Sequence, residues 1–491
     1  MQTVSCPSCG AEVKFRSHAS VMAVCEYCNT SVLKDVDAVQ DLGRMSSVLE
    51  DYSPIQIGAS GVFGGRQFSV VGRIQLRYAA GVWNEWYLLF DDGQTAWLGD
   101  SSGLYTITTA RDAGGPLPSF DALEPGRMES IGAERFMTSE LRTAQCVGGQ
   151  GELPFKVGEG WQAKVADFRR GASFVTLDYS DGPAPAVYNG LSVTLDGLKF
   201  QLLRDEDQIQ RSAGRYRGKL SALDCPACGG PIKYLPGMTA NLLCPACRTR
   251  IDAAGPEARV LAAGEKAAAV PTSLELGAVA SLNKQEYRVI GFMVRRDDEG
   301  ARWTEYLLHG ARSGFSWLVE TEEGWFRANV MEEWPDWHWT GADTATFDKV
   351  AYEKLYDYRA TVVHAAGAFN WRVAVGDSAR VYEFKHNQVR LSAELTGEEL
   401  TWSRSTPIPT DQVKAWFGAA FHGELSPATP KEVWVKGRYG IMAKKFIMIM
   451  LVLNAIPVLF AFRSAFVPTL LGALAVYLPA LFLDFTDKDD T

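Results

Sequence analysis

The chain has 491 residues, of which 47% are hydrophobic and 22% are charged, and its formal net charge is −9. The length allows roughly three or four domains of ordinary size, and the composition is that of a globular protein. The acidic balance argues against a protein whose main surface binds nucleic acid, because such domains are usually basic. The sequence does not open with a basic region followed by an apolar segment, so we expect no signal peptide.

Eight of the nine cysteines form two sets with the same spacing, Cys-x2-Cys-x15-Cys-x2-Cys. The first set is Cys6, Cys9, Cys25 and Cys28, and the second is Cys225, Cys228, Cys244 and Cys247. In a cytosolic chain this pattern indicates metal sites rather than disulfides. Four thiolates bind Zn²⁺ tetrahedrally and leave no open position for catalysis. We therefore predict two zinc ions, one for each set, with a rubredoxin-type iron site as the alternative.

Each set is expected to fold as a zinc ribbon, over residues 1–34 and 225–253, in which the metal stabilises a fragment too small to fold alone. Gly10 and Gly229 follow the second cysteine of each set, where a positive φ lets backbone amides approach the sulfurs. Nucleic-acid binding by the ribbons is the alternative, supported only by a few basic residues such as Lys14 and Arg250. The ninth cysteine, Cys146, has no motif around it, which favours a buried thiol.

The sequence downstream of each cysteine set also repeats. The two sets lie 219 residues apart, and "WNEW" at 83–86 matches "WTEY" at 303–306. Trp97-Leu98 matches Trp317-Leu318, and Asp167-Phe168 resembles Glu383-Phe384. The chain is therefore a duplicated module, with two β-domains expected over residues 54–205 and 273–410. Linkers are expected at 206–224 and 254–272.

The coarse secondary structure of the repeated domain is mostly strand. Residues 68–74, 83–90 and 94–98 are short, aromatic or β-branched segments bounded by Gly and Asp. The turn at 91–93 predicts a hairpin over 83–98, and both strand faces are apolar, as in a sandwich or barrel. Residues 35–51 carry apolar side chains at helical spacing, which predicts a linker helix within 35–53.

The Trp-x-Glu motif, kept in both copies, is the candidate site. We expect its tryptophans to belong to the core. A glutamate beside aromatic residues is costly to bury without a partner, so Glu85 and Glu305 are expected either to pair with an arginine such as Arg77 or Arg302, or to line a ligand pocket. That pocket is Trp83, Glu85, Trp97, Trp303, Glu305 and Trp317. No catalytic residue is predicted, because the six histidines are scattered and no nucleophile or phosphate-loop motif occurs.

The C-terminal part contains two apolar segments, 446–462 and 465–483, separated by Arg463-Ser464. Each is about long enough to span a bilayer, which predicts a transmembrane helical hairpin over 446–483. The basic residues at 431–445 predict that the N-terminal domains and the acidic tail, 484–491, are cytoplasmic. Residues 411–445 form an amphipathic and basic juxtamembrane segment, whose first part is expected either to lie on the membrane or to pack on the core.

The segments "SPIQIGASGVFGGRQFSVVGRIQLRY", "WNEWYLLFDDG" and "GELPF" resemble an uncharacterised bacterial family of small β-domains, often preceded by Cys-x2-Cys knuckles. The resemblance covers 54–205 closely and 273–405 more loosely. It implies a domain of unknown function and a link to membrane-stress or polyamine-related systems at the bacterial inner membrane.

Taken with the motifs, the sequence predicts a mainly β chain of two zinc ribbons, two sandwich-like or barrel-like domains and a membrane hairpin. The expected function is a non-enzymatic scaffold or sensor on the cytoplasmic face of the inner membrane, with the lipid bilayer and other proteins as partners. The alternatives are a module that binds a small ligand or nucleic acid, and an enzyme of unrecognised class.

Overall fold

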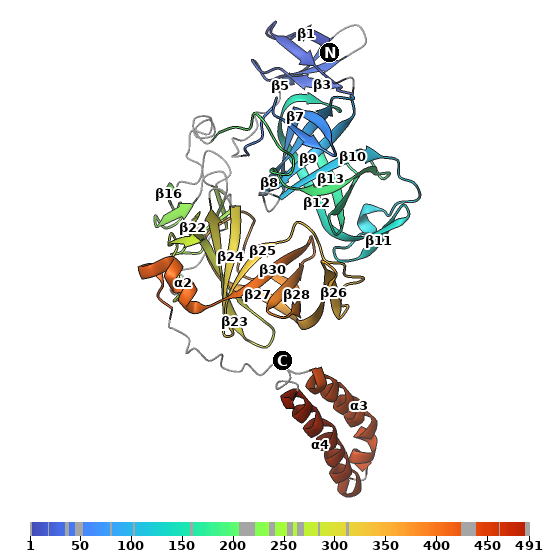
Figure 1. The fold of residues 1–491 in the computed structure, drawn as a ribbon, viewed down its shortest axis with the longest axis vertical. Helices are drawn as coiled ribbons and strands as arrows, with labels where there is room; N and C mark the ends of the chain where they lie inside the picture. Colours follow the sequence, from blue (N-terminus) through green and yellow to red (C-terminus); the bar gives the residue numbers. More distant parts are fainter. Residues whose placement is uncertain are drawn as a thin grey trace. The chain divides into compact units, whose positions relative to one another are not determined.

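The computed structural model describes the following residues: 2–17, 19–34, 39–44, 53–78, 81–101, 104–157, 161–205, 221–234, 241–252, 259–262, 270–282, 285–310, 314–423, 438–460 and 462–486. The chain divides into two compact units, Met1–Leu425 and Ser426–Thr491. The first unit is mainly β-strand and contains two barrels (Figure 1).

Barrel 1 is a closed ring of eight antiparallel strands, in which β12 pairs with β13 on one side and with β7 on the other. Around the ring the strands are β7 (Arg66–Tyr78), β8 (Gly81–Phe90), β9 (Thr95–Ser101), β10 (Leu104–Arg111), β15 (Ala186–Val193), β14 (Ser173–Asp178), β13 (Gln162–Arg170) and β12 (Glu134–Leu153). Strands β6 (Ser60–Phe63) and β11 (Met128–Ile131) pair with β7 and β12 outside the ring, and η1 is Phe120–Ala122.

Barrel 2 repeats this ring with the same strand order, and β27 closes it against β22. Its strands are β22 (Gln285–Arg296), β23 (Arg302–Gly310), β24 (Gly314–Thr321), β25 (Gly324–Val330), β30 (Leu400–Ile408), β29 (Val389–Leu395), β28 (Ser378–His386) and β27 (Val350–Phe369). Strands β21 (Val279–Leu282) and β26 (Thr344–Phe347) pair with β22 and β27. The expected choice between sandwich and barrel is therefore resolved in favour of the barrel.

Each cysteine module contributes a two-stranded hairpin and a three-stranded extension of the adjoining barrel sheet. The first module contains β1 (Gln2–Ser5), β2 (Glu12–Phe15), β3 (Met22–Val24), β4 (Thr30–Lys34) and β5 (Val39–Arg44). The second contains β16 (Ser221–Asp224), β17 (Pro231–Tyr234), β18 (Asn241–Leu243), β19 (Arg250–Asp252) and β20 (Arg259–Ala262). Because β3 pairs with β12 and β18 with β27, each ribbon continues the sheet of its barrel.

Three features of this region differ from the sequence-based expectations. The predicted linker helix over 35–53 is wrong at 39–44, where β5 pairs with β4; the rest of that segment lies largely outside the described residues. The second module begins at Ser221, ahead of the expected 225, because β16 pairs with β17. The expected linker at 254–272 contains β20, which pairs with β19.

The predicted hairpin over 83–98 is confirmed, with β8 and β9 paired from Asn84–Asp100 to Leu89–Thr95. Alternation along β8 directs Trp86, Leu88 and Phe90 outward. There they form a core with Ile55 and other residues that cover the outside of the barrel. Both faces of the strand are therefore buried, one inside the barrel and one beneath its cover.

Helix α2 (Thr410–Phe417) belongs to the core of barrel 2 and is followed by η2 (Gly418–Ala420). Val413 and Phe417 are buried among residues of β21 to β25. Of the two alternatives for this segment, packing on the core is therefore correct over the described residues. Residues 424–437, the middle of the predicted juxtamembrane segment, lie outside the described part.

The second unit is a pair of helices, α3 (Arg438–Phe460) and α4 (Phe462–Thr486), as Figure 1 shows. Arg463 and Ser464 lie within α4, so the turn predicted at these residues is wrong. Within the described helices, none combines the length and apolar character needed to cross a bilayer, and the predicted transmembrane hairpin over 446–483 is not supported.

Candidate functional site: the interior of barrel 1

Barrel 1 encloses a cavity of about 230 Å³. Lining residues come from all eight strands of the ring, and along most of these strands they alternate, as Trp83 and Glu85 do on β8. These are the inward-facing positions of the barrel. An eight-stranded barrel is just wide enough either to be filled by its own side chains or to hold one small ligand.

The cavity combines carboxylates with aromatic walls. Six carboxyl groups and two guanidinium groups line it: Glu85, Asp100, Glu140, Asp167, Asp178 and Glu399, with Arg142 and Arg169. Seven aromatic residues line the same space: Trp83, Trp97, Phe155, Trp161, Phe174, Tyr188 and Trp334. Phe155 links two of them, with ring centroids 5.8 Å from Trp97 and 5.4 Å from Trp161.

Residues of barrel 2 complete the lining at one end of the cavity. Met331, Trp334 and Leu400 are among them. The backbone N–H of Trp334 donates to the carbonyl of Gly171 at 3.0 Å, and that of Leu141 donates to the carbonyl of Glu398 at the same distance. These contacts hold residues of barrel 2 against barrel 1.

Both arginines of the cavity are engaged by other protein groups. Arg142 forms an ion pair with Glu140 and lies 3.8 Å from a carboxylate oxygen of Glu399. Arg169 donates to Ser192 and to the backbone carbonyl of Glu332. Neither forms an ion pair with Glu85 or Asp178 among the described residues, so the carboxylates outnumber the cations available to them.

Glu85 projects from β8 into the cavity and accepts one hydrogen bond, 2.9 Å long, from the indole N–H of Trp83. In the described part of the chain no basic side chain lies within ion-pair distance of it, so the expected arginine partner is not present. Burial raises the pKa of the Glu85 carboxyl to about 8, although the indole hydrogen bond opposes the shift. The nearby Asp167, Asp100 and Asp178 raise the pKa further by charge repulsion.

Ser139 on β12 is a polar group without a hydrogen-bond partner in this space, among the described residues. Its side chain lines the cavity and the residue is 4% exposed. The hydroxyl makes no hydrogen bond in the described structure. A buried hydroxyl without a partner is costly, so this position favours a polar group of a ligand or a water molecule inside the barrel.

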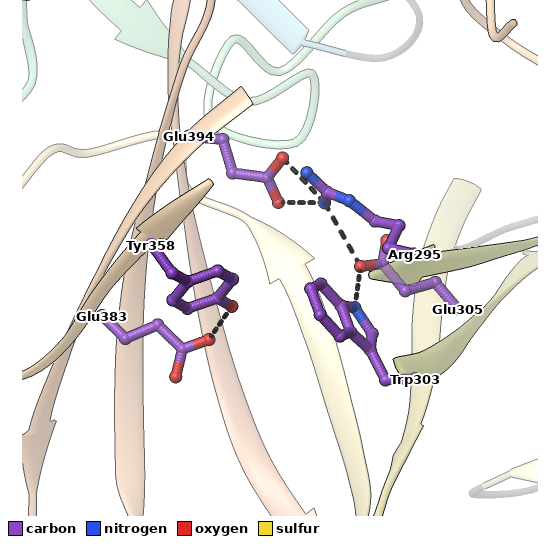
Figure 2. Close-up of polar contacts among 6 residues, drawn as sticks. All are labelled: Arg295, Trp303, Glu305, Tyr358, Glu383 and Glu394. Carbon is purple, nitrogen blue, oxygen red and sulfur yellow. Dashed lines mark hydrogen bonds and ion pairs between the residues drawn. The ribbon is translucent and has the colours of Figure 1, made fainter. Parts of the chain in front are cut away.

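Barrel 2 holds the same motif in a different environment. The indole N–H of Trp303 donates to Glu305 at 2.7 Å, as Trp83 does to Glu85. Here, however, Arg295 lies between two carboxylates: Figure 2 shows its guanidinium directed at both Glu305 and Glu394. The nitrogen–oxygen distances are 3.2 Å to Glu305 and 2.9 Å to Glu394. The arginine expected near Glu305 was Arg302, and that expectation is corrected to Arg295.

Strand register identifies what has changed between the two barrels. Leu76 stands opposite Trp83 on β7, whereas Arg295 stands opposite Trp303 on β22. Gly99 stands opposite Glu85, whereas Val319 stands opposite Glu305. Larger side chains therefore occupy the interior of barrel 2 at positions where barrel 1 has leucine and glycine.

Gly99 is a place where the cavity depends on the absence of a side chain. A Cβ at this position would lie 2.8 Å from the hydroxyl oxygen of Thr106 and 3.6 Å from both carboxylate oxygens of Glu85. Thr106, which pairs with Gly99, is itself replaced in barrel 2 by Phe326, the partner of Val319. Both barrels have the same ring of strands. The cavity of barrel 1 therefore depends on which side chains occupy a few inward positions.

Two segments, 56–195 and 275–410, match the family described as a domain of unknown function, DUF4178. Together they cover more than half of the sequence. The chain belongs to the DUF4178 family. No curated protein and no solved structure matches it significantly.

The "GELPF" segment of the first DUF4178 domain connects the ribbon, the ring and the cavity. Gly151 has a φ of 67°, and a Cβ there would lie 2.2 Å from the carbonyl oxygen of Val71, so glycine is required where β12 crosses to β7. Glu152 is buried and accepts hydrogen bonds of 2.9 Å from the backbone N–H of Ser17 and the hydroxyl of Ser20 in the ribbon. Phe155 then lines the cavity. In the second domain alanine replaces this glutamate at position 368.

The cysteines of each set come together as the spacing predicts, with their four sulfurs within 4.8 Å of one another. The distances Cys6–Cys28 and Cys9–Cys25 are 3.6 and 3.7 Å, and both corresponding distances in the second set are 3.7 Å. A tetrahedral zinc–thiolate site requires about 3.8 Å between sulfurs, given a Zn–S bond of about 2.3 Å. The donor set and its geometry therefore fit a metal ion at each site. Gly10 and Gly229 have positive φ as expected.

The structure thus brings Trp83, Glu85 and Trp97 to one cavity, while Trp303 and Glu305 take part in an internal ion-pair cluster and Trp317 packs on Trp371. Sequence reasoning missed Leu76, Gly99, Ser139 and Asp178, which determine the character of the cavity. The alternation of side chains along each strand could have indicated which residues share a face with Trp83 or Glu85. Only the strand order shows that these faces line the same interior. Cys146 packs at the edge of a barrel 1 core cluster.

Proposed function

We propose that the chain is a non-enzymatic ligand sensor, in which barrel 1 binds a small molecule and barrel 2 and the ribbons form its scaffold. The observation that carries this proposal is the contrast between the two barrels. Barrel 2 has Arg295, Val319 and Phe326 at the positions where barrel 1 has Leu76, Gly99 and Thr106, and these three residues of barrel 1 line its cavity. A cavity lined by apolar walls and a few polar groups is typical of a small-molecule site.

We favour binding without chemical conversion because Ser139, a possible nucleophile in the cavity, has no base hydrogen-bonded to it in the described structure. Ser139 is the serine of β12 in the cavity, and its hydroxyl has no hydrogen bond to a base in the described structure. Activation of a serine requires such a base within hydrogen-bond reach. In this proposal a bound molecule would contact both barrels, because residues of barrel 2 complete the lining.

The test compares small molecules released from the purified protein. Wild-type protein and the Gly99→Val variant, which imitates barrel 2, are purified identically, denatured and analysed by mass spectrometry. We expect a compound released in stoichiometric amount from the wild type and absent from the variant. Leu76→Arg serves as a second variant in case Gly99→Val does not fold. Identical release from the wild type and folded variants would contradict the proposal.

The metal proposed for both cysteine sites is zinc, where it would stabilise the ribbon as a structural ion without an open coordination position. The four-sulfur geometry supports a metal ion at each site. Metal analysis of the purified chain should find two zinc ions. Visible absorption typical of ferric thiolates would assign iron instead.

The helical pair α3–α4 is proposed to bind the lipid bilayer of the bacterial inner membrane, with the first unit in the cytoplasm. Support comes from the large apolar side chains that this unit exposes, including Phe446, Val452, Leu453 and Leu471. Its polar side chains bond to their own helix: the Asn454 amide donates to the carbonyl of Met450 at 2.9 Å. Vesicle flotation should carry the full chain upward and leave a chain truncated after residue 425 at the bottom. Equal behaviour of the two would contradict this part of the proposal.

A further inference from the structure

The two barrels differ in whether an arginine neutralises the carboxylates of their interior. In barrel 2 the carboxylates of Glu305 and Glu394 are neutralised by the guanidinium of Arg295, whose side chain is 6% exposed. In barrel 1 the equivalent carboxylates are Glu85 and Asp178, as the register of both rings shows. The position that would supply the cation is Leu76.

From this we infer that barrel 1 binds a small organic cation, whose ammonium or guanidinium group takes the place that Arg295 fills in barrel 2. This inference rests on the proposed function and names its ligand class. The cation would lie between Glu85 and Asp178, beside Trp83, over whose ring the guanidinium carbon of Arg142 already lies 5.3 Å from the centroid. Arg295 has the same neighbours in barrel 2, with its guanidinium carbon 5.9 Å from the ring centroid of Trp303.

The walls of the cavity match the rest of such a molecule. Tryptophan is the best aromatic partner for a cation, and desolvation strengthens the attraction. Trp97, Phe155 and Trp161 line the cavity and offer aromatic surface together with apolar contact for an alkyl part. A cavity of 230 Å³ suits a molecule of roughly six to twelve non-hydrogen atoms, because a cavity of about 150 Å³ holds benzene.

The buried hydroxyl of Ser139 is compatible with the same class of ligand. It lines the cavity without a hydrogen-bond partner in the described structure, and it can accept a hydrogen bond from an N–H group. An anionic ligand fits poorly, because Arg142 and Arg169 already bond to Glu140, Glu399 and the carbonyl of Glu332.

A metal cation is disfavoured by the spacing of the carboxylates. Calcium takes six to eight oxygen ligands at about 2.3–2.6 Å, which requires several carboxylates close together. Among the described residues only the two cysteine sets bring three or more ligand atoms within 4.8 Å of one another. The carboxylates of barrel 1 surround the space without converging on one point, which suits a larger cation.

The experiment is calorimetric titration of the full-length protein with three probes of similar size. These are n-butylguanidine, which imitates the Arg295 side chain, n-butylamine and the neutral 1-butanol. We expect at least one of the two cations to bind, and 1-butanol to bind at least about 30-fold more weakly, because a buried charge pair carries this much selectivity. Glu85→Gln keeps the acceptor for the Trp83 indole and removes the carboxyl that can ionise beside a bound cation, and should weaken cation binding by a similar factor.

The control variant is Glu305→Gln, which removes the same charge from the equivalent position of barrel 2 and should leave cation affinity within about twofold. Failure of both cations to bind the wild type, equal affinity for 1-butanol, or unchanged cation affinity in Glu85→Gln would each overturn the inference. If a neutral or anionic compound is released from the wild type but not from Gly99→Val, the proposed function holds and only the ligand class is wrong. If no compound is released and no cation binds, both fail.

Discussion

Leu76 and Arg295 occupy the same position in the two barrels of this protein, each directly across from the tryptophan of the Trp-x-Glu motif. Arg295 satisfies two carboxylates of its barrel, and Leu76 satisfies none. One residue therefore separates an interior stabilised by its own charges from one that leaves Glu85 without a cation. Because the domain is duplicated, barrel 2 shows how the same carboxylate positions are arranged when a cation lies between them.

Leu76→Arg should convert barrel 1 into a second filled barrel. The new guanidinium can reach Glu85 and Asp178, and hydrogen bonds to charged groups contribute about 1.5–3 kcal/mol each. We expect the ligand-free variant to unfold at a higher denaturant concentration than the wild type, and to lose ligand binding. Leu76→Met is the matched control, because it keeps the volume without adding charge. If Leu76→Arg stabilises no more than Leu76→Met, the equivalence of the two positions is wrong.

Arg295→Leu should destabilise barrel 2 strongly. Removal of one partner from a buried ion pair costs roughly 3–5 kcal/mol, because the other charge is left buried without compensation. The double variant Arg295→Leu, Glu305→Gln should recover part of this loss, since it also removes one of the two stranded carboxylates. Chemical denaturation of the wild type, the two single variants and the double variant measures the coupling. Additive effects would show that Arg295 does not act through Glu305.

The stability of the ligand-free protein should decrease as the pH rises. The Glu85 carboxyl has a pKa of about 8 when folded and an ordinary value of 4.5. Below pH 4.5 both states are protonated; between pH 4.5 and 8 the unfolded state releases its proton while the folded state keeps it, so unfolding becomes easier. In the wild type, the free energy of unfolding should fall by on the order of 3 kcal/mol across this pH window. We expect Glu85→Gln to abolish this fall.

Thermal unfolding of wild type and Glu85→Gln from pH 5 to 9 measures this effect. The other charged or titratable groups that face the cavity are Asp100 on β9, Glu140 and Arg142 on β12, Asp167 and Arg169 on β13, Asp178 on β14, Tyr188 on β15, and Glu399 just before β30. They are unchanged in the variant, so the comparison isolates Glu85. Parallel pH profiles for the two proteins would show that the Glu85 carboxyl is not desolvated.

Loss of one zinc site should extend beyond the ribbon. Met22 and Val24 of β3 pack with Ile74 and Leu153 in one core cluster of barrel 1. Cys25→Ser should therefore lower the metal content from two ions to one and also increase proteolysis of the adjoining barrel. Cys146→Ser, outside both sets, should keep two ions. A Cys25→Ser protein with a fully protected barrel 1 would mean that the ribbon is an independent core.

Part of this fold could be predicted from the sequence. The repeated Cys spacing predicted both four-sulfur clusters, and the Asp91-Asp92-Gly93 turn predicted the β8–β9 hairpin. Both signals are local, because each depends on residues close together in the chain. The helix expected over 35–51 failed because Val39 and Leu42, which fit helical spacing, lie on β5, where pairing with β4 overrides a weak local preference.

The site itself depended on long-range pairing. Closure of barrel 1 joins β12 to β7, residues about seventy positions apart, as in the pair Gly149–Ile74. Arg295 was missed as the partner of Glu305 because the two residues lie on neighbouring strands, and a register shift between Val289 and Gly291 precedes them. Sequence spacing alone does not reveal which side chains face the same interior.

The central claim is that barrel 1 holds an organic cation where barrel 2 holds its own arginine. A crystal structure of the protein, soaked with whichever of n-butylguanidine and n-butylamine binds more tightly, tests it most directly. The account predicts ligand density in barrel 1, with a nitrogen within hydrogen-bond distance of Glu85 or Asp178, and Arg295 in place between Glu305 and Glu394. Water alone between Glu85 and Asp178, or protein side chains filling that space, would contradict it.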